Sequence, residues 1–355
     1  MIKNNDYHEQ QNIKNSLLLK EIMYSLPSFT FEFFRGIEQT TTSKTRIAYA
    51  YDLRLFFEFM LEYHKDFKEK KMSDIILVDL EKINPDDVEM YLEYLSFYKK
   101  TDTKGNIIEH KNTERGKSRK LASLRTFYTY FYKKQKIKNN PALLIDLPKI
   151  HDKNITRLEI DEVARLLDEV ESGDKLTKSQ KKYHNHTKER DLALLTLLLG
   201  TGIRVSECVG LNISDIDFNV NGIRIIRKGG NEVIIYFGDE VEDALTIYLE
   251  KRKSIIPVSG HEDALFLSMQ DKRLSVRSVQ NLVKKYSKLV TSLKNISPHK
   301  LRSTYGTNLY RETGDIYLVA DVLGHKDVNT TKKHYAQIED QRRRKAAKII
   351  RLRND

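Results

Sequence analysis

Arg204 and Glu207, in the second half of the chain, form a pair that could hold a phosphate. Gly200 and Gly202 precede the arginine, and the carboxylate follows it by three residues. Glycines let the backbone turn after an apolar segment, residues 192–199, so we expect Arg204 at the next helix start with Glu207 one turn on. A guanidinium can hold two phosphate oxygens at once. Taken alone, an arginine and a glutamate at this spacing are more often a surface salt bridge.

A second cationic pair, His299 and Arg302, follows a proline near the end of the chain. Pro298 favours a helix start, and residues three apart on a helix share one face. Backbone N–H groups at a helix N-terminus favour an anion. A histidine and an arginine in the same first turn therefore indicate a second phosphate contact. The competing interpretation is an ordinary capped surface helix.

Three further residues have the types that a phosphoryl-transfer site needs. Lys228 stands at the edge of a Gly-Gly turn, where it could donate a proton to a departing alkoxide, although a lysine in this position is, on its own, more often a plain turn residue. Gly324 is expected to end a helix and to present His325 from the following loop. Tyr335 has cationic neighbours and could act as a nucleophile if its proton is taken. One tyrosine among 19 is, on its own, far more often a core or surface residue.

The second half that carries these residues is predicted to be helical apart from one hairpin. Apolar runs at 163–170 and 192–199 indicate helices, and the polar stretch 172–188 between them is expected to be a loop. Two β-branched runs, residues 223–227 and 233–237, flank Lys-Gly-Gly-Asn-Glu and predict a β-hairpin.

The first half is also predicted to be helical. Apolar and aromatic residues recur at helical spacing over residues 43–63, with Thr42 or Ser43 as a cap. Asn84 and the proline after it start another helix, and the polar segment 101–113 is expected to be a loop or short ribbon.

The next helix, from Glu114 to about Lys136, is strongly basic. It carries aromatic residues beside five cations that could face DNA: Arg115, Lys117, Arg119, Lys120 and Arg125. A solvated charged face on an ordinary bundle helix is the alternative.

Composition favours a polyanionic partner in a reducing compartment. The chain has 62 lysines and arginines against 50 aspartates and glutamates, a net charge of +12. Its one cysteine, Cys208, excludes an internal disulfide framework and a cysteine zinc site. We expect no membrane span and a cytoplasmic location, because no apolar run is long enough to cross a bilayer. His184 and His186 lie in a lysine-rich stretch without a carboxylate at ligand spacing, so no metal is expected.

These segments, in this order, resemble the tyrosine site-specific recombinase family, or phage-type integrases, and especially its Xer-like and mobile-element branch. The resemblance covers residues 40–341. It implies a mainly α fold with a small β-sheet or hairpin: a helical core-binding domain followed by a mixed α/β catalytic domain. The implied division is an N-terminal extension (1–39), a core DNA-binding domain (40–147), a linker (148–156) and a catalytic domain with a C-terminal docking tail (157–355).

The resemblance also implies a role for each candidate. Arg204 and Arg302 would clamp the scissile phosphate, and Lys228 would protonate the leaving 5′ oxygen. His299 would act as a general acid/base, and His325 would donate a hydrogen bond to the phosphate. Glu207 would support the site, and Tyr335 would be the nucleophile that forms a 3′-phosphotyrosyl link. His325 and Tyr335 are ten residues apart, one more than is usual in the family.

The implied partners are double-stranded DNA and three further copies of the chain, as a tetramer on two DNA sites. Residues 338–352 would dock onto a neighbouring copy, or pack on their own chain. Neither a metal nor ATP is expected, because two arginines and a lysine would neutralise the developing charge and the phosphotyrosyl link stores the bond energy. Two rival functions remain: a catalytically silent DNA-binding regulator, and a type IB topoisomerase that relaxes DNA without pairing sites. The target sequence and accessory proteins do not follow from the sequence.

Overall fold

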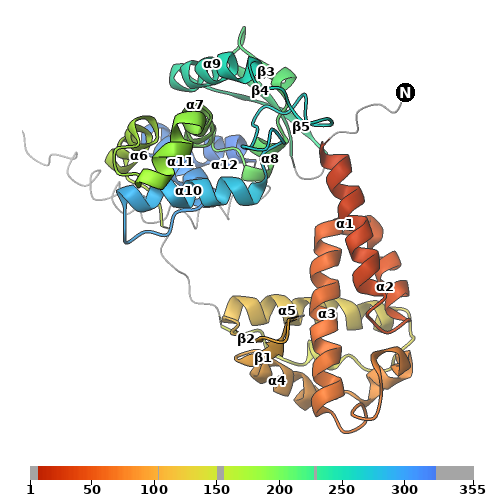
Figure 1. Ribbon diagram of the computed structural model, residues 1–355. Helices are drawn as coiled ribbons and strands as arrows, with labels where there is room; N and C mark the ends of the chain where they lie inside the picture. Colours follow the sequence, from red (N-terminus) through yellow and green to blue (C-terminus); the bar gives the residue numbers. More distant parts are fainter. Residues whose placement is uncertain (1–6, 103, 150–155, 228–229, 325–355) are drawn as a thin grey trace, which may run out of the picture. The chain divides into compact units, whose positions relative to one another are not determined.

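The computed structural model describes residues 7–102, 104–149, 156–227 and 230–324. The chain divides into two compact units, Met1–Asp152 and Lys153–Asp355 (Figure 1). The mainly helical, two-part fold class predicted from the sequence is confirmed. No helix among the described residues is long and apolar enough to cross a membrane.

The first unit is a helical bundle with one β-ribbon. Its helices are α1 (Tyr7–Met23), α2 (Thr30–Gly36), α3 (Ser43–Tyr63), α4 (Pro85–Tyr94) and α5 (Glu114–Lys133). Strands β1 (Tyr98–Thr101) and β2 (Ile107–His110) pair antiparallel, so the ribbon alternative for this stretch is correct. Short 3-10 turns lie at Glu38–Thr40, Met72–Asp74, Leu77–Lys82 and Pro141–Leu143.

Two helix starts in this unit follow the predicted caps. The hydroxyl of Thr42 accepts a hydrogen bond of 3.2 Å from the Thr45 backbone N–H, and the Asn84 side chain accepts from that of Asp87 at 3.1 Å. The described part of the predicted N-terminal extension, residues 7–39, packs into this unit: α1 contacts α3, and its apolar residues join one core with α3, α4 and α5.

The second unit surrounds one long helix. Helix α7 (Lys178–Thr201) packs against α6 (Ile160–Ser172), α9 (Asp239–Lys253) and α11 (Pro298–Thr313), as Figure 1 shows. The remaining helices are α8 (Val205–Gly210), α10 (Val276–Val290) and α12 (Ile316–Leu323). Four leucines of α7 are buried and contribute to the centre of this core: Leu194, Leu195, Leu197 and Leu198.

The predicted hairpin is present and gains a third strand. Strands β4 (Gly222–Ile226) and β5 (Glu232–Tyr236) pair antiparallel, with Ile225 opposite Val233. The short strand β3 (Ile216–Asp217) pairs with the outer edge of β4, and a 3-10 turn at Ile213–Asp215 precedes it.

One predicted loop was wrong. Residues 172–188 were expected to be irregular, but α7 begins at Lys178 and continues through this polar stretch. Thr177 and Gln180 cap its start reciprocally: the Gln180 N–H donates to the Thr177 hydroxyl, and the Thr177 N–H to the Gln180 side chain. The first half of the helix lies largely at the surface and so lacks an apolar pattern. Helix α5 also ends three residues early, before Gln135 with its positive φ of 55°.

Candidate active site

Gly202 fixes the direction in which the chain leaves α7. It adopts the left-handed conformation with φ of 63°, and its N–H donates to the Leu198 carbonyl. A Cβ at this position would lie 2.4 Å from a ring carbon of Tyr305. Only glycine fits both the conformation and the space, and the turn places Arg204 as the residue that starts α8.

The predicted pairing of Arg204 and Glu207 is present, and the carboxylate is buried. Glu207 accepts from the Arg204 backbone N–H at 2.7 Å and from its Nη1 at 2.8 Å. The side chain of Glu207 is 4% exposed and that of Arg204 is 34% exposed. An exposed surface salt bridge does not have this burial. The buried carboxylate therefore positions the Arg204 guanidinium, which remains partly accessible to solvent.

Helix α11 begins at Pro298 as predicted and carries the second pair. His299 is exposed in its first turn, and Arg302 lies one turn further on with only 5% of its surface accessible. The Arg302 guanidinium donates to the Gly202 carbonyl at 2.5 Å and to the Leu323 carbonyl. The structure therefore brings Arg302 to the same turn that positions Arg204.

The end of α12 is the meeting point of three guanidinium groups. Arg204 Nη2 donates to the Gly324 carbonyl at 3.2 Å, and Arg302 donates to that of Leu323. Arg227, at the end of β4, donates to the Asp321 carbonyl at 3.2 Å and to the Val322 carbonyl at 2.7 Å. Four consecutive carbonyls thus accept from arginine. A helix C-terminus leaves such oxygens unpaired and carries partial negative charge, so cations stabilise it.

Arg227 is the residue that the sequence analysis missed. It directly precedes Lys228 at the predicted hairpin turn. A second cation beside a candidate catalytic lysine could have indicated that Arg227 also belongs to the site. Gly324 has φ of 60°, and a Cβ there would lie 2.2 Å from Arg227 Nη1. The arginine therefore lies tightly against the end of α12.

Three candidates cannot be placed. Lys228, His325 and Tyr335 lie outside the described residues, as does the predicted docking tail 338–352. Arg227 and Gly324 are the described residues that precede Lys228 and His325 in the chain.

Two neutral groups lie behind the arginines. Burial raises the pKa of the Cys208 thiol, and the adjacent Glu207 carboxylate adds to that shift. Burial also raises the pKa of Tyr305, whose ring packs on Gly202. Both groups therefore stay protonated near neutral pH, so neither adds a negative charge beside the arginines.

The basic helix α5 uses several of its cations inside its own unit. Arg119 and Lys120 both pair with Asp52, a carboxylate only 3% exposed. Arg125 donates to the Ala142 carbonyl at 2.9 Å and to the Ile145 carbonyl, which ties α5 to the segment that follows it. Two predicted DNA-facing residues remain. Arg115 is exposed, and the Lys117 ammonium donates a hydrogen bond to the Ser96 hydroxyl.

His184 has a packing role. It is buried on α7, its Nε2 lies 2.8 Å from the Val170 carbonyl, and its ring fills the space beside Gly173. Within the described ranges, no three histidine, cysteine or acidic side chains are grouped so that they could hold a metal ion.

A scan against protein families matches residues 156–342 to the Phage integrase family. The chain belongs to this family. Tyrosine recombinase XerC of Caldanaerobacter subterraneus subsp. tengcongensis is 36% identical over 310 residues, covering 84% of this chain and 79% of that protein. Tyrosine recombinase XerD of Oceanobacillus iheyensis is 33% identical over 292 residues, covering 77% of this chain and 93% of that protein.

Solved structures share the fold. The XerH site-specific recombinase, in a post-cleavage complex with a palindromic difH substrate, aligns with a TM-score of 0.59 at 20% identity over 94% of both chains. A lambda integrase dimer bound to a COC′ core site aligns with a TM-score of 0.60 at 16% identity, over 86% of this chain and 94% of that one. The prediction of a Xer-like tyrosine recombinase, an enzyme that cleaves and rejoins DNA strands, is confirmed by the family match and these relatives.

Proposed function

We propose that Tyr335 attacks a DNA phosphate while Arg204 and Arg302 hold its non-bridging oxygens. The observation that carries this proposal is the convergence of both guanidinium groups on the consecutive carbonyls of Leu323 and Gly324. These carbonyls stand immediately before the segment that contains His325 and Tyr335. Two arginines from separate helices are thus directed at neighbouring oxygen atoms, the arrangement that a phosphate requires.

The proposed step balances without a cofactor. The phenol oxygen of Tyr335 bonds to phosphorus, the bond to the 5′ oxygen breaks, and Lys228 gives a proton to the departing oxygen. His299 accepts the tyrosine proton, and His325 adds a hydrogen bond to the phosphate. Rejoining reverses these steps with the 5′ hydroxyl of a second strand, so the 3′-phosphotyrosyl link supplies the bond energy.

The exposure of the two arginines suggests an order of contact. Arg204 is 34% exposed, whereas Arg302 is buried with both Nη atoms bonded to carbonyls. A phosphate would meet Arg204 first. Arg302 would then exchange a carbonyl for a phosphate oxygen, a neutral acceptor for a charged one, which is the stronger bond.

The wider assignments are proposals of the same kind. Residues 40–147 would bind duplex DNA, residues 157–355 would carry the chemistry, and four copies would pair two DNA sites. The net charge of +12 and the complexes of XerH with difH and of lambda integrase with a COC′ core site support DNA as the substrate.

Covalent trapping tests the mechanism. Wild type and Tyr335→Phe are incubated with random genomic fragments and with nicked duplexes, then denatured and assayed for protein–DNA adducts. We expect adducts with wild type alone, and sequencing the trapped ends would supply the target site. Adducts with Tyr335→Phe would overturn the choice of nucleophile.

Two further measurements separate the rival functions. Salt-sensitive DNA binding without any adduct would favour a catalytically silent regulator. Strand exchange between two copies of the recovered site would favour a recombinase, whereas relaxation of supercoiled DNA without exchange would favour a topoisomerase-like enzyme.

A further inference from the structure

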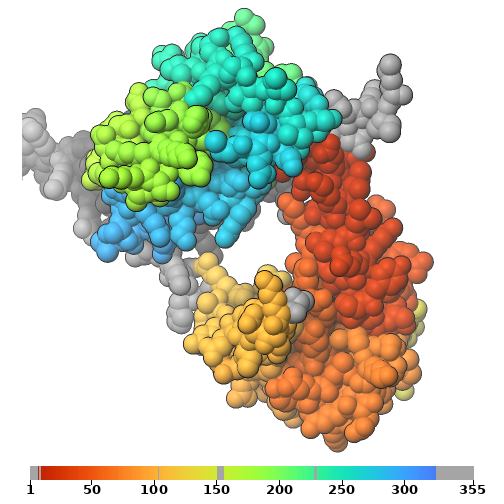
Figure 2. Space-filling view, in the orientation of Figure 1, coloured from red at the N-terminus to blue at the C-terminus, as the bar shows by residue number. Residues whose placement is uncertain are grey.

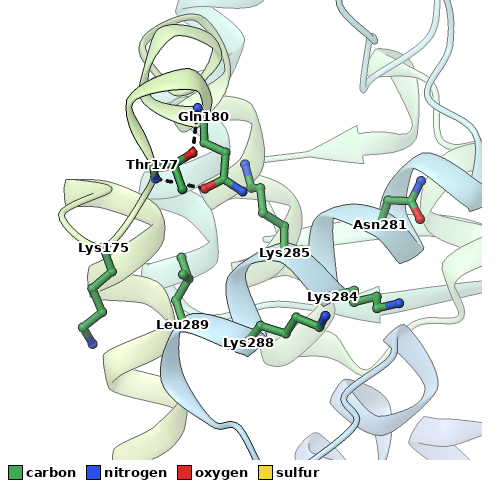
Figure 3. Close-up of a pocket in the computed structure, with 8 residues that line it drawn as sticks. All are labelled: Lys175, Thr177, Gln180, Asn281, Lys284, Lys285, Lys288 and Leu289. Atoms are coloured by element: carbon green, nitrogen blue, oxygen red, sulfur yellow. Dashed lines mark hydrogen bonds between the residues drawn. The ribbon is translucent and has the colours of Figure 1, made fainter.

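A lysine-lined cavity of about 380 Å³ lies between the turn that joins α6 to α7 and the second half of α10 (Figure 3). Its cations are Lys175, Lys284, Lys285 and Lys288, and Gln180 and Asn281 add polar groups. Figure 3 shows Lys285 extending from α10 toward Gln180. We call these six residues the lysine pocket. None of them belongs to the site of the three arginines.

The positive charge of the lysine pocket is poorly balanced. No aspartate or glutamate is among its lining residues. Lys284 and Lys288 are exposed and four residues apart on α10, a spacing at which like charges destabilise a helix. No acidic partner within the described ranges pairs with Lys175, Lys284 or Lys288. The arrangement therefore favours an anion in the pocket.

The nearest carboxylates are already engaged. Asp191 lies 3.6 Å from Lys285 Nζ, but it is buried and accepts from Arg190 at 2.6 Å and Tyr286 at 3.1 Å. Glu169 is also buried and accepts from the Lys175 backbone N–H at 2.7 Å. Burial lowers the pKa of Lys285, and the Asp191 carboxylate only partly opposes that shift. An anion in the lysine pocket would offset this unfavourable burial.

We propose that the lysine pocket binds a phosphate of the DNA backbone several nucleotides from the scissile one. This inference rests on the proposed function, since it extends the same substrate along the second unit. Helix α10 packs against α8, which Arg204 starts, and α10 forms part of the surface of its unit (Figure 2). Gln180 lies 22 residues before Gly202, which ends α7 beside Arg204, a separation of about 33 Å at 1.5 Å per residue. One DNA strand presents a phosphate every ~3.4 Å along the duplex axis, so the bound phosphate would lie up to about ten nucleotides from the scissile one.

Lysine is the residue type expected for binding a backbone phosphate. Its ammonium is a point charge on a flexible stem, suited to a backbone phosphate and without the fixed geometry that reads a base edge. The pocket would therefore add affinity without sequence preference. Its contribution should depend on salt, because each neutralised phosphate releases counterions.

The salt dependence of DNA binding tests the proposal without knowledge of the target site. The dissociation constant for a random-sequence duplex is measured at several salt concentrations with the full chain, for wild type and for Lys284→Gln/Lys288→Gln. We expect the slope of log affinity against log salt to become shallower by about 0.9 for each phosphate that the double variant fails to neutralise. Lys253→Gln is the matched control, because Lys253 is exposed on α9, on the other side of α7 from α10 in Figure 1. An unchanged slope in the double variant would overturn the proposal.

Two further arms identify the phosphate and its source. In the first arm, single phosphates of a duplex with the trapped site are replaced in turn by neutral methylphosphonates. At one or two positions this replacement should lower the DNA affinity of wild type but leave the affinity of the double variant unchanged. The second arm compares inorganic phosphate with chloride at equal ionic strength. If phosphate raises the Tm of wild type more than that of the double variant while the DNA slope is unchanged, the pocket takes a free anion and the DNA proposal is overturned.

This inference and the proposed function can fail separately. At saturating DNA, Lys284→Gln/Lys288→Gln should form as much covalent adduct as wild type, because the lysine pocket does not touch the reacting atoms. Tyr335→Phe alone decides the nucleophile, whereas the salt slope alone decides the lysine pocket.

Discussion

The guanidinium of Arg204 donates a hydrogen bond of 3.2 Å to the carbonyl oxygen of Gly324. This hydrogen bond joins the start of α8 to the end of α12, two positions far apart in the sequence. Arg302 and Arg227 bond to the carbonyls just before it. The end of α12 is therefore held by the residues proposed to hold the phosphate, and its backbone conformation should control activity.

Replacing Gly324 by alanine should disrupt this arrangement. The substitution strains a left-handed residue and puts a methyl group 2.2 Å from Arg227 Nη1. We expect adduct formation to fall at least tenfold. Gly260→Ala is the control, because Gly260 also has a positive φ of 85° but nothing within 4 Å. That variant should lose about 1 kcal/mol of stability and keep its activity. Equal adduct formation by the two variants would contradict this prediction.

Arg227 should act as a positioning residue. Arg227→Gln loses a charged donor to the Asp321 and Val322 carbonyls, so the end of α12 is held less firmly. We expect the adduct formation rate at saturating DNA to fall about tenfold with little change in DNA affinity. Arg224→Gln, on β4 three residues before Arg227 but paired with Asp215, should change neither. A loss of affinity with an unchanged rate would instead mean that Arg227 binds DNA directly.

Glu207 should be needed as an anion. Its carboxylate accepts two bonds from Arg204, and an amide would put its N–H₂ group against one of these donors. The loss of a charge-assisted hydrogen bond costs about 1.5–3 kcal/mol, so Glu207→Gln should slow adduct formation ten- to a hundredfold. Glu250→Gln, in an exposed pair with Lys253, should react at the wild-type rate. If Glu207→Gln also reacts at that rate, the carboxylate does not position Arg204.

Asp79 should make the first unit less stable in acid. Burial raises the pKa of this carboxyl, but hydrogen bonds from Lys70, Lys82 and the Ile76 N–H outweigh that effect and lower it to about 2. An unfolded aspartate titrates near pH ~3.9. The folded pKa is the lower one, so the stabilisation is present above pH ~3.9 and is lost as pH falls through about 2.

Urea unfolding of wild type and Asp79→Asn checks this dependence. We expect wild type to be more stable by about 2 kcal/mol near pH 6. The difference should shrink steadily below pH ~4. A difference that stays constant down to pH ~2.5 would show that the carboxylate charge is not its source.

Cys208 should be inert in the folded protein. It is the one cysteine of the chain, its side chain is fully buried, and burial raises its pKa. The thiolate is the reactive form. A thiol reagent such as dithionitrobenzoate should therefore label it only in denaturant. Rapid labelling of the native protein would mean that α8 opens readily.

The sequence by itself determined the local structure and the identity of the chemistry. Thr42 and Asn84 cap the helices that follow them, Pro298 starts α11, and Gly324 ends α12, because each of these signals acts over one turn. The Gly-Gly turn between β-branched runs produced the hairpin for the same reason. The order of the candidate residues also pointed to the recombinase family.

Only the tertiary structure decided which cations meet. Arg204, Arg227 and Arg302 come from three separate elements, and their common target is a set of backbone carbonyls that every sequence possesses. No side-chain pattern in the sequence predicts a backbone carbonyl as the partner of an arginine. The same reason explains Arg125, a predicted DNA-facing residue whose guanidinium binds the Ala142 and Ile145 carbonyls instead of standing free. The polar first half of α7 was missed because a surface helix held by its cap and its apolar second half needs no apolar period of its own.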